Sequence, residues 1–241
     1  MRVLAFLLLA ATAGWGQTCV PTTIDDFKTG QTTSPIVLQT PNTSAIAFQN
    51  ASGVPGRVRE ESYSVTTNDF NHPSELAIVR PNSNPNGGAL VVSNGVEEFF
   101  SLVLIYGTDT RGNPVPLGFQ VPANCDRFRV WFDSSVATLS FTFEAYTRNA
   151  NGSTTGFADG IGMPPVIAGF PGCVDFPFSN FVTNASGVVQ NIAHTPVDQI
   201  ILVLGPGSAV GGSNFAMTKI EVSDNRLPPT GVPCIIANNG K

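Results

Sequence analysis

Asp126–Tyr146 reads DRFRVWFDSSVATLSFTFEAY and contains two runs in which apolar and polar residues strictly alternate. Alternation with a period of two is typical of β-strands that bury one face. The short link between the runs, residues 134–138, predicts that they pair as an antiparallel hairpin. The apolar residues that this hairpin places in the core are Phe128, Val130, Phe132, Phe141 and Phe143.

The polar face of this hairpin holds the candidate ligand-binding residues. One register sets Arg129 opposite Glu144, an opposite-charge pair of about 0.2–1 kcal/mol. Registers displaced by two residues satisfy the alternation equally well. Trp131 and Tyr146 lie on the same face, and sugars stack on such rings while carboxylates and guanidinium groups bind their hydroxyls. The alternative is that Trp131 lies under a covering layer with its N–H group hydrogen-bonded.

The rest of the chain is also predicted to be all-β. About ten short strands are separated by turns rich in Gly, Pro and Asn, with no convincing 3.6-residue periodicity. Phe99–Tyr106 is apolar on both faces, which favours the middle of a sheet that is covered on both sides. Arg148–Pro171 is predicted to be the longest irregular stretch. The pattern indicates a single-domain antiparallel β-sandwich of jelly-roll type.

The N-terminus has the features of a secretory signal peptide over residues 1–16. Arg2 precedes the apolar run Val3–Ala13, and Gly14-Trp15-Gly16 provides a small-x-small cleavage site. We therefore expect a secreted protein whose single domain spans residues 17–241. The apolar run is too short to span a membrane, and no second run reaches that length.

The charge balance argues against a nucleic-acid partner. The formal net charge is -5, and only 12% of the residues are charged, against about 25% in typical globular domains. Nucleic-acid binding requires a basic stripe, which this sequence does not provide.

Four cysteines in an exported chain predict two disulfides, for which three pairings exist. We favour Cys19–Cys234, which ties the two ends of the chain, together with Cys125–Cys173, which braces the hairpin. Cys19–Cys125 with Cys173–Cys234 remains an open alternative. The cysteine spacings are far from those of zinc sites.

No constellation in the sequence predicts catalysis or a cofactor. Adjacent carboxylates occur at residues 25–26, 60–61 and 97–98, and neighbours on a strand point to opposite faces. His72 and His194 have no metal-ligand partners at suitable spacing, and no G-x-S-x-G motif is present. We therefore expect that the protein is not an enzyme.

Three segments carry a resemblance to a known group of proteins. They are the opening IDDF at residues 24–27, the strand Asp126–Asp133 and the closing FAMTKIEV at residues 215–222. In order and spacing these segments resemble the jelly-roll sandwiches of secreted carbohydrate-binding modules and related bacterial domains. The resemblance implies a carbohydrate partner. It also implies a structural calcium near the N-terminal strand, for which the candidates are Asp25, Asp26 and Asp224.

Three functional hypotheses follow. The first is a secreted, non-catalytic β-sandwich that binds carbohydrate or another cell-surface ligand through Arg129, Trp131, Glu144 and Tyr146. The second is a structural or adhesive extracellular protein without a small ligand. The third is an extracellular glycoside hydrolase, which would need two carboxyl groups about 5–9 Å apart in a groove.

Overall fold

The computed structural model describes residues 18–28, 35–51, 53–79, 88–95, 98–135, 139–148, 154–162, 172–181, 192, 196–206, 214–226 and 234–237. The signal peptide predicted over residues 1–16 lies outside these residues.

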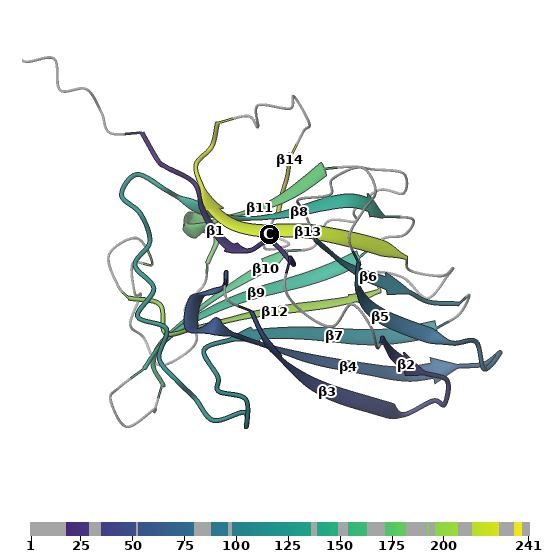
Figure 1. The fold of residues 1–241 in the computed structure, drawn as a ribbon. Coiled ribbons are helices and arrows are strands. Elements are labelled where there is room, and N and C mark those ends of the chain that lie inside the picture. The colour runs from purple at the N-terminus through teal and green to yellow at the C-terminus, as the bar shows by residue number, and fades with distance from the viewer. Residues whose placement is uncertain are drawn as a thin grey trace, which may run out of the picture.

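Two β-sheets pack face to face as a sandwich (Figure 1). In spatial order, the eight-stranded sheet contains β14 (Cys234–Ile236), β11 (Gly172–Pro177), β8 (Arg127–Ser135), β13 (Phe215–Ser223), β6 (Ala89–Ser93), β5 (Ser74–Val79) and β2 (Ile36–Leu38), with β1 (Thr22–Asp25) also paired to β13. The six-stranded sheet contains β10 (Thr154–Gly162), β9 (Leu139–Arg148), β12 (Gln199–Pro206), β7 (Glu98–Tyr106), β4 (Val58–Asn68) and β3 (Thr43–Asn50). The helical elements within the described residues are two 3-10 turns, η1 (Pro55–Arg57) and η2 (Phe178–Asn180).

The strand pairing confirms the predicted all-β, antiparallel sandwich of jelly-roll type. β11 and β14 run parallel, and the other strand pairs described are antiparallel. β7 lies between β12 and β4, as predicted for the middle of a sheet. Its outward residues, including Val103 and Ile105, are only half-buried, so the prediction that both faces of this strand are covered is wrong.

The predicted hairpin is wrong, although its core residues are right. β8 belongs to the eight-stranded sheet and β9 to the six-stranded sheet. Phe128 stacks on Phe143 across the interior, with ring centroids 4.3 Å apart, and Phe132 meets Phe141 edge-on at 5.4 Å. The chain therefore passes from one sheet to the other between Ser135 and Leu139. Two strands that face each other across a sandwich alternate just as hairpin neighbours do, so the pattern could not separate the two arrangements.

A strand occupies part of the segment that was predicted to be irregular. β10 pairs antiparallel with β9, from Thr154 opposite Arg148 to Gly162 opposite Phe141. The prediction of an irregular Arg148–Pro171 is wrong here because three glycines at residues 156, 160 and 162 interrupt the apolar alternation.

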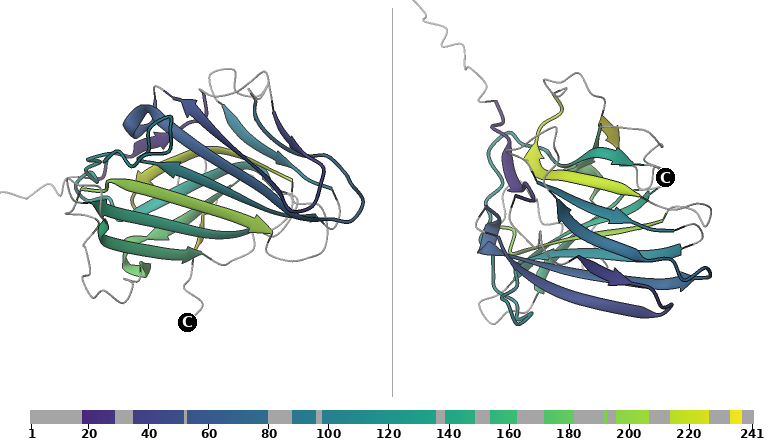
Figure 2. Two further views of the ribbon diagram at one scale, coloured as in Figure 1. Left: turned by 90° about the horizontal axis from the view of Figure 1, so that it is seen from below. Right: turned by 45° about the vertical axis from the view of Figure 1, so that its right-hand side comes forward.

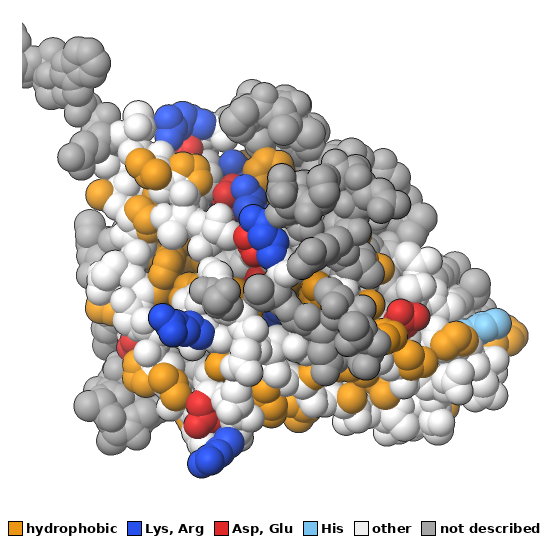
Figure 3. All heavy atoms as spheres, viewed as in Figure 1, with side chains coloured by type: hydrophobic (Ala, Val, Ile, Leu, Met, Phe, Trp, Pro, Cys, Tyr) orange, Lys and Arg blue, Asp and Glu red, His pale blue; other side chains and the backbone are white. Residues whose placement is uncertain are grey.

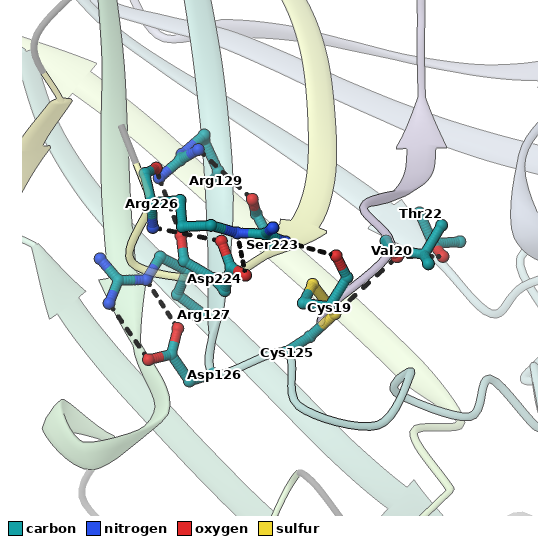
Figure 4. Close-up of a disulfide and its surroundings, with 10 residues drawn as sticks. All are labelled: Cys19, Val20, Thr22, Cys125, Asp126, Arg127, Arg129, Ser223, Asp224 and Arg226. Carbon is teal, nitrogen blue, oxygen red and sulfur yellow. Dashed lines mark hydrogen bonds and ion pairs between the residues drawn. A yellow bond between two sulfur atoms is a disulfide. The ribbon is translucent and has the colours of Figure 1, made fainter. Parts of the chain in front are cut away.

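The structure also corrects the favoured disulfide pairing, because it joins Cys19 to Cys125 and Cys173 to Cys234. Cys173 and Cys234 are direct neighbours in the parallel pair of β11 and β14. Cys19 lies beside the segment that leads into β8, where its carbonyl also accepts a hydrogen bond from Arg226 Nη2 at 2.7 Å (Figure 4). The first bridge thus fastens the N-terminal segment to the residues that lead into β8, and the second fastens β14 to β11; no spacing rule could reveal these pairings.

A buried ion cluster joins β1 to the six-stranded sheet. Arg59 on β4 donates to Asp25 Oδ2 at 2.7 Å and to Glu61 Oε1 at 2.8 Å. Tyr106 Oη also donates to Asp25, and all four side chains are buried. The cluster therefore holds the N-terminal strand against both layers of the sandwich.

Glu61 makes stability depend on pH. Burial raises the pKa of its carboxyl above the ordinary 4.5, although Arg59 acts in the opposite direction. A raised pKa in the folded state means that this contribution to stability is complete below pH 4.5 and is lost as the pH rises through the folded-state pKa.

Glu61→Gln is therefore expected to make the free energy of unfolding less dependent on pH, because the variant lacks this titrating carboxyl. Chemical denaturation from pH 4 to 8 should show that the wild type loses more stability with rising pH than the variant does. Glu60→Gln, on the outward face of the same strand, is the control and should keep the wild-type slope. Equal slopes for all three proteins would contradict this role of Glu61.

Candidate functional site

The four predicted ligand-binding residues lie on opposite surfaces of the sandwich. Arg129 and Trp131 project from the outer face of β8, and Glu144 and Tyr146 from the outer face of β9. The prediction that they share one surface is wrong because it depended on the hairpin. The structure instead presents two separate surfaces, one on each sheet.

On the eight-stranded sheet, the edge and a face of the Trp131 ring already have protein partners. The indole Nε1 donates to Glu221 Oε1 at 2.8 Å. Lys219 Nζ lies 5.0 Å from the ring centroid and pairs with Glu221 Oε2 at 2.8 Å. A sugar that stacked beneath Lys219 would have to displace this cation and weaken a cation–π contact.

Arg129 belongs to the same saturated surface. Its Nε and Nη2 donate to the two oxygens of Asp175, at 2.6 and 2.9 Å, in a bidentate pair. Its Nη2 also donates to the carbonyl oxygens of Asp224 and Arg226. Both Arg129 and Asp175 are buried, and Figure 3 shows basic and acidic side chains side by side on this face. These charged side chains form ion pairs with one another, so their role on this surface is structural.

On the six-stranded sheet, Tyr146 and Glu144 form a pair that faces solvent. Tyr146 Oη donates to Glu144 Oε2 at 2.6 Å, and both side chains are half-buried. Glu144 is opposite Ile201 of β12, which is itself opposite Ile105 of β7. The outward, half-buried side chains that form the centre of this surface are Val103, Ile105, Ile201 and Val203. Figure 2 (left) presents this sheet in front.

A loop borders one end of this surface. Residues 107–119 follow β7, and Leu117 N donates to the carbonyl of Asp198 just before β12. Gly112, near the tip of the loop, lies against the Phe48 ring on β3. The centre of the six-stranded surface is therefore apolar; we call Val103, Ile105, Ile201 and Val203 the apolar floor. The pair of Tyr146 and Glu144 lies on one side of this floor, and the loop 107–119 borders one end. Sequence reasoning missed the floor, although the two-faced apolar runs in β7 and β12 were its signal.

A shallow hollow of about 400 Å³ lies between β2 and β3. Its described lining consists of Val37, Leu38, Gln39, Thr40 and Thr43. None of these five residues is charged or aromatic, so they offer less for recognition than the apolar residues beside Tyr146. Among the residues described, no helix has the length and apolar character needed to cross a membrane.

Comparison with known proteins finds likeness at the level of structure. No family model and no curated protein matches the sequence. A family 11 carbohydrate-binding module of a cellulosomal cellulase of Clostridium thermocellum is 13% identical, with a TM-score of 0.43, over 88% of this chain and 99% of that one. The chain resembles these modules in fold. A second structure of a family 11 module from that organism, in complex with a β-1,3-1,4-mixed-linked tetrasaccharide, is 13% identical over 85% of this chain and 95% of that one, at a TM-score of 0.40.

A Bacteroides vulgatus protein provisionally named a glycoside hydrolase is also similar. It is 7% identical over 78% of this chain and 97% of that one, with a TM-score of 0.39. At such identities the likeness concerns the arrangement of strands, so the chemistry has to be read from this chain's own residues.

The calcium candidates are separate in the structure. The Asp25 carboxylate contacts Arg59 and Tyr106, Asp26 pairs with Lys28 at 2.9 Å, and Asp224 pairs with Arg226 at 2.7 Å. Within the described residues, no three His, Cys, Asp or Glu side chains gather as metal ligands would. The three candidate aspartates thus do not gather around one point in the structure.

Proposed function

We propose that the protein is exported after cleavage behind Gly16 and acts as a non-catalytic extracellular protein that binds carbohydrate on the outer face of its six-stranded sheet. The observation that supports this proposal is the hydrogen-bonded pair of Tyr146 and Glu144 beside the apolar floor. The ring and the aliphatic side chains would contact the C–H faces of a sugar. The carboxylate, already oriented by the tyrosine hydroxyl, would accept hydrogen bonds from sugar hydroxyls.

The charges of this surface favour a neutral polymer and a role without catalysis. Among the described residues of its strands, Glu60 and Glu144 are the acidic side chains that face outward, and β7 and β12 lie between them. Three strand spacings place them about 14 Å apart. Glycosidases hold their two carboxyl groups about 5–9.5 Å apart, so this pair cannot act together on one glycosidic bond.

Tyr146→Ala is expected to weaken glycan binding by about 30-fold or more, the loss typical of a central aromatic contact. The measurement is a glycan-array screen with the wild type, followed by titration calorimetry of the best ligand. Trp131→Ala is the matched control, because it removes a half-buried ring from the opposite surface and should leave the affinity unchanged.

A second readout places the ligand independently of the variants. Once residues 1–16 are removed, Trp131 is the sole tryptophan of the chain, and its fluorescence reports on the eight-stranded surface. A ligand on the six-stranded surface should leave this emission unchanged. A wild type that binds no glycan, or binding that is lost in Trp131→Ala and kept in Tyr146→Ala, would refute the proposed surface.

A further inference from the structure

β3 is the outermost strand of the six-stranded sheet. It pairs with β4 along its whole length, from Thr43 opposite Val65 to Asn50 opposite Val58. Among the strands that the structure describes, none lies beyond it, and Figures 1 and 2 show it at the margin of the sheet. The backbone groups on that side of β3 therefore form a potential template for a further strand.

This edge lacks the features that usually protect an edge strand. Natural edges are kept short, carry charged residues or proline, or are twisted by a bulge. β3 has eight residues, reads TSAIAFQN without charge or proline, and pairs with β4 without a register shift. Its outward Ile46 is 60% exposed. By contrast, β2 and β14, which end the eight-stranded sheet, have three residues each.

We propose that two copies of this chain pair antiparallel through β3, about a two-fold axis, to form one continuous twelve-stranded sheet. In an antiparallel pair, outward residues must oppose outward residues. A register centred on Ala47 satisfies this condition. It sets Ile46 of each copy opposite Phe48 of the other, and Ser44 opposite Asn50.

The composition of the strand supports a second copy as the occupant. Two Ile46–Phe48 pairs form at once in this register, and aromatic residues opposite β-branched ones are favourable cross-strand pairs. No like charges meet across the axis, because the strand carries none. The interface is self-complementary, as two-fold symmetry requires. Because one strand pair buries less than the roughly 1,600 Å² of a standard interface, we infer a dimer that depends on concentration.

Sedimentation velocity over a dilution series tests this proposal. The wild type should shift from dimer to monomer on dilution. Ile46→Lys places a charge on the edge and removes both apolar pairs, and it should weaken dimerisation by about tenfold or more. Ser62→Lys is the matched control, because Ser62 lies opposite Ile46 on β4, one strand inside the edge. It should keep the wild-type dimer.

Two further variants keep the test decisive if Ile46→Lys does not fold. Ser44→Lys adds a charge at an exposed edge position and should also favour the monomer. Ala47→Cys lies on the proposed axis and should form a disulfide-linked dimer on a non-reducing gel, whereas Ala45→Cys should not. A wild type that stays monomeric at its highest soluble concentration would overturn the proposal, and so would a dimer that survives both lysine substitutions on β3.

Discussion

Arg59→Met should lower the free energy of unfolding by about 3–5 kcal/mol, because it leaves buried carboxylates without their counter-charge. The Arg59 side chain is fully buried and pairs with Asp25 and Glu61. Burial alone would lower its pKa, but the two carboxylates raise it above the ordinary value, so the guanidinium stays charged. The guanidinium also lies 5.1 Å from the centroid of the Phe27 ring, and this contact is lost as well.

Guanidinium chloride denaturation at pH 7 measures this loss. Arg57→Met is the control because Arg57 is exposed two residues earlier, and its substitution should cost no more than about 0.5 kcal/mol. Adding Asp25→Asn to Arg59→Met should restore part of the stability, since it removes one uncompensated charge. If Arg59→Met and Arg57→Met were equally stable, the cluster would not fasten β1 as described.

Replacing Cys19 and Cys125 together by alanine should cost about 4.8 kcal/mol. The bridge spans 106 residues, and loop-closure entropy in the unfolded chain gives this value. The same reasoning gives about 4.3 kcal/mol for Cys173–Cys234, which spans 61 residues. Each loss is a large fraction of the total stability of a typical domain, which is about 5–15 kcal/mol.

Thermal and chemical denaturation of the two double variants, with the wild type in parallel, would measure these losses. Mass spectrometry of non-reduced proteolytic peptides should find the peptide with Cys19 linked to the one with Cys125, and the peptide with Cys173 linked to the one with Cys234. Peptides that linked 19 to 234 would contradict the structure. Equal stability of wild type and both variants would show that the bridges do not restrict the unfolded chain.

The sequence predicted the core of this fold better than its connections. Phe128 and Phe143 alternate with polar neighbours, and both are buried as expected. Burial depends on one strand at a time, so a pattern in one strand can predict it. Which strands pair depends on backbone partners far away in the chain, and for that reason the facing strands β8 and β9 were taken for a hairpin.

The prediction of the candidate site was limited for the same reason, because it also required knowing which strands are neighbours. Tyr146 and Glu144 were recognised from their residue types, yet they were combined with Trp131, which lies on the opposite surface. The chemistry of a side chain is local, whereas its neighbours are set by sheet order. The apolar floor joins β7 to β12, and these strands are almost a hundred residues apart in the chain.

The two disulfides also determine how the molecule responds to a pulling force. Tension applied to the two ends would pass from Cys19 to Cys125 and from Cys234 to Cys173 through covalent bonds. Only the segment between residues 125 and 173 would then be stretched. β3, β4, β7 and β12 lie outside that path, whereas β9 lies within it, so the load would bypass the apolar floor and the exposed edge but pass through the strand that carries Tyr146 and Glu144.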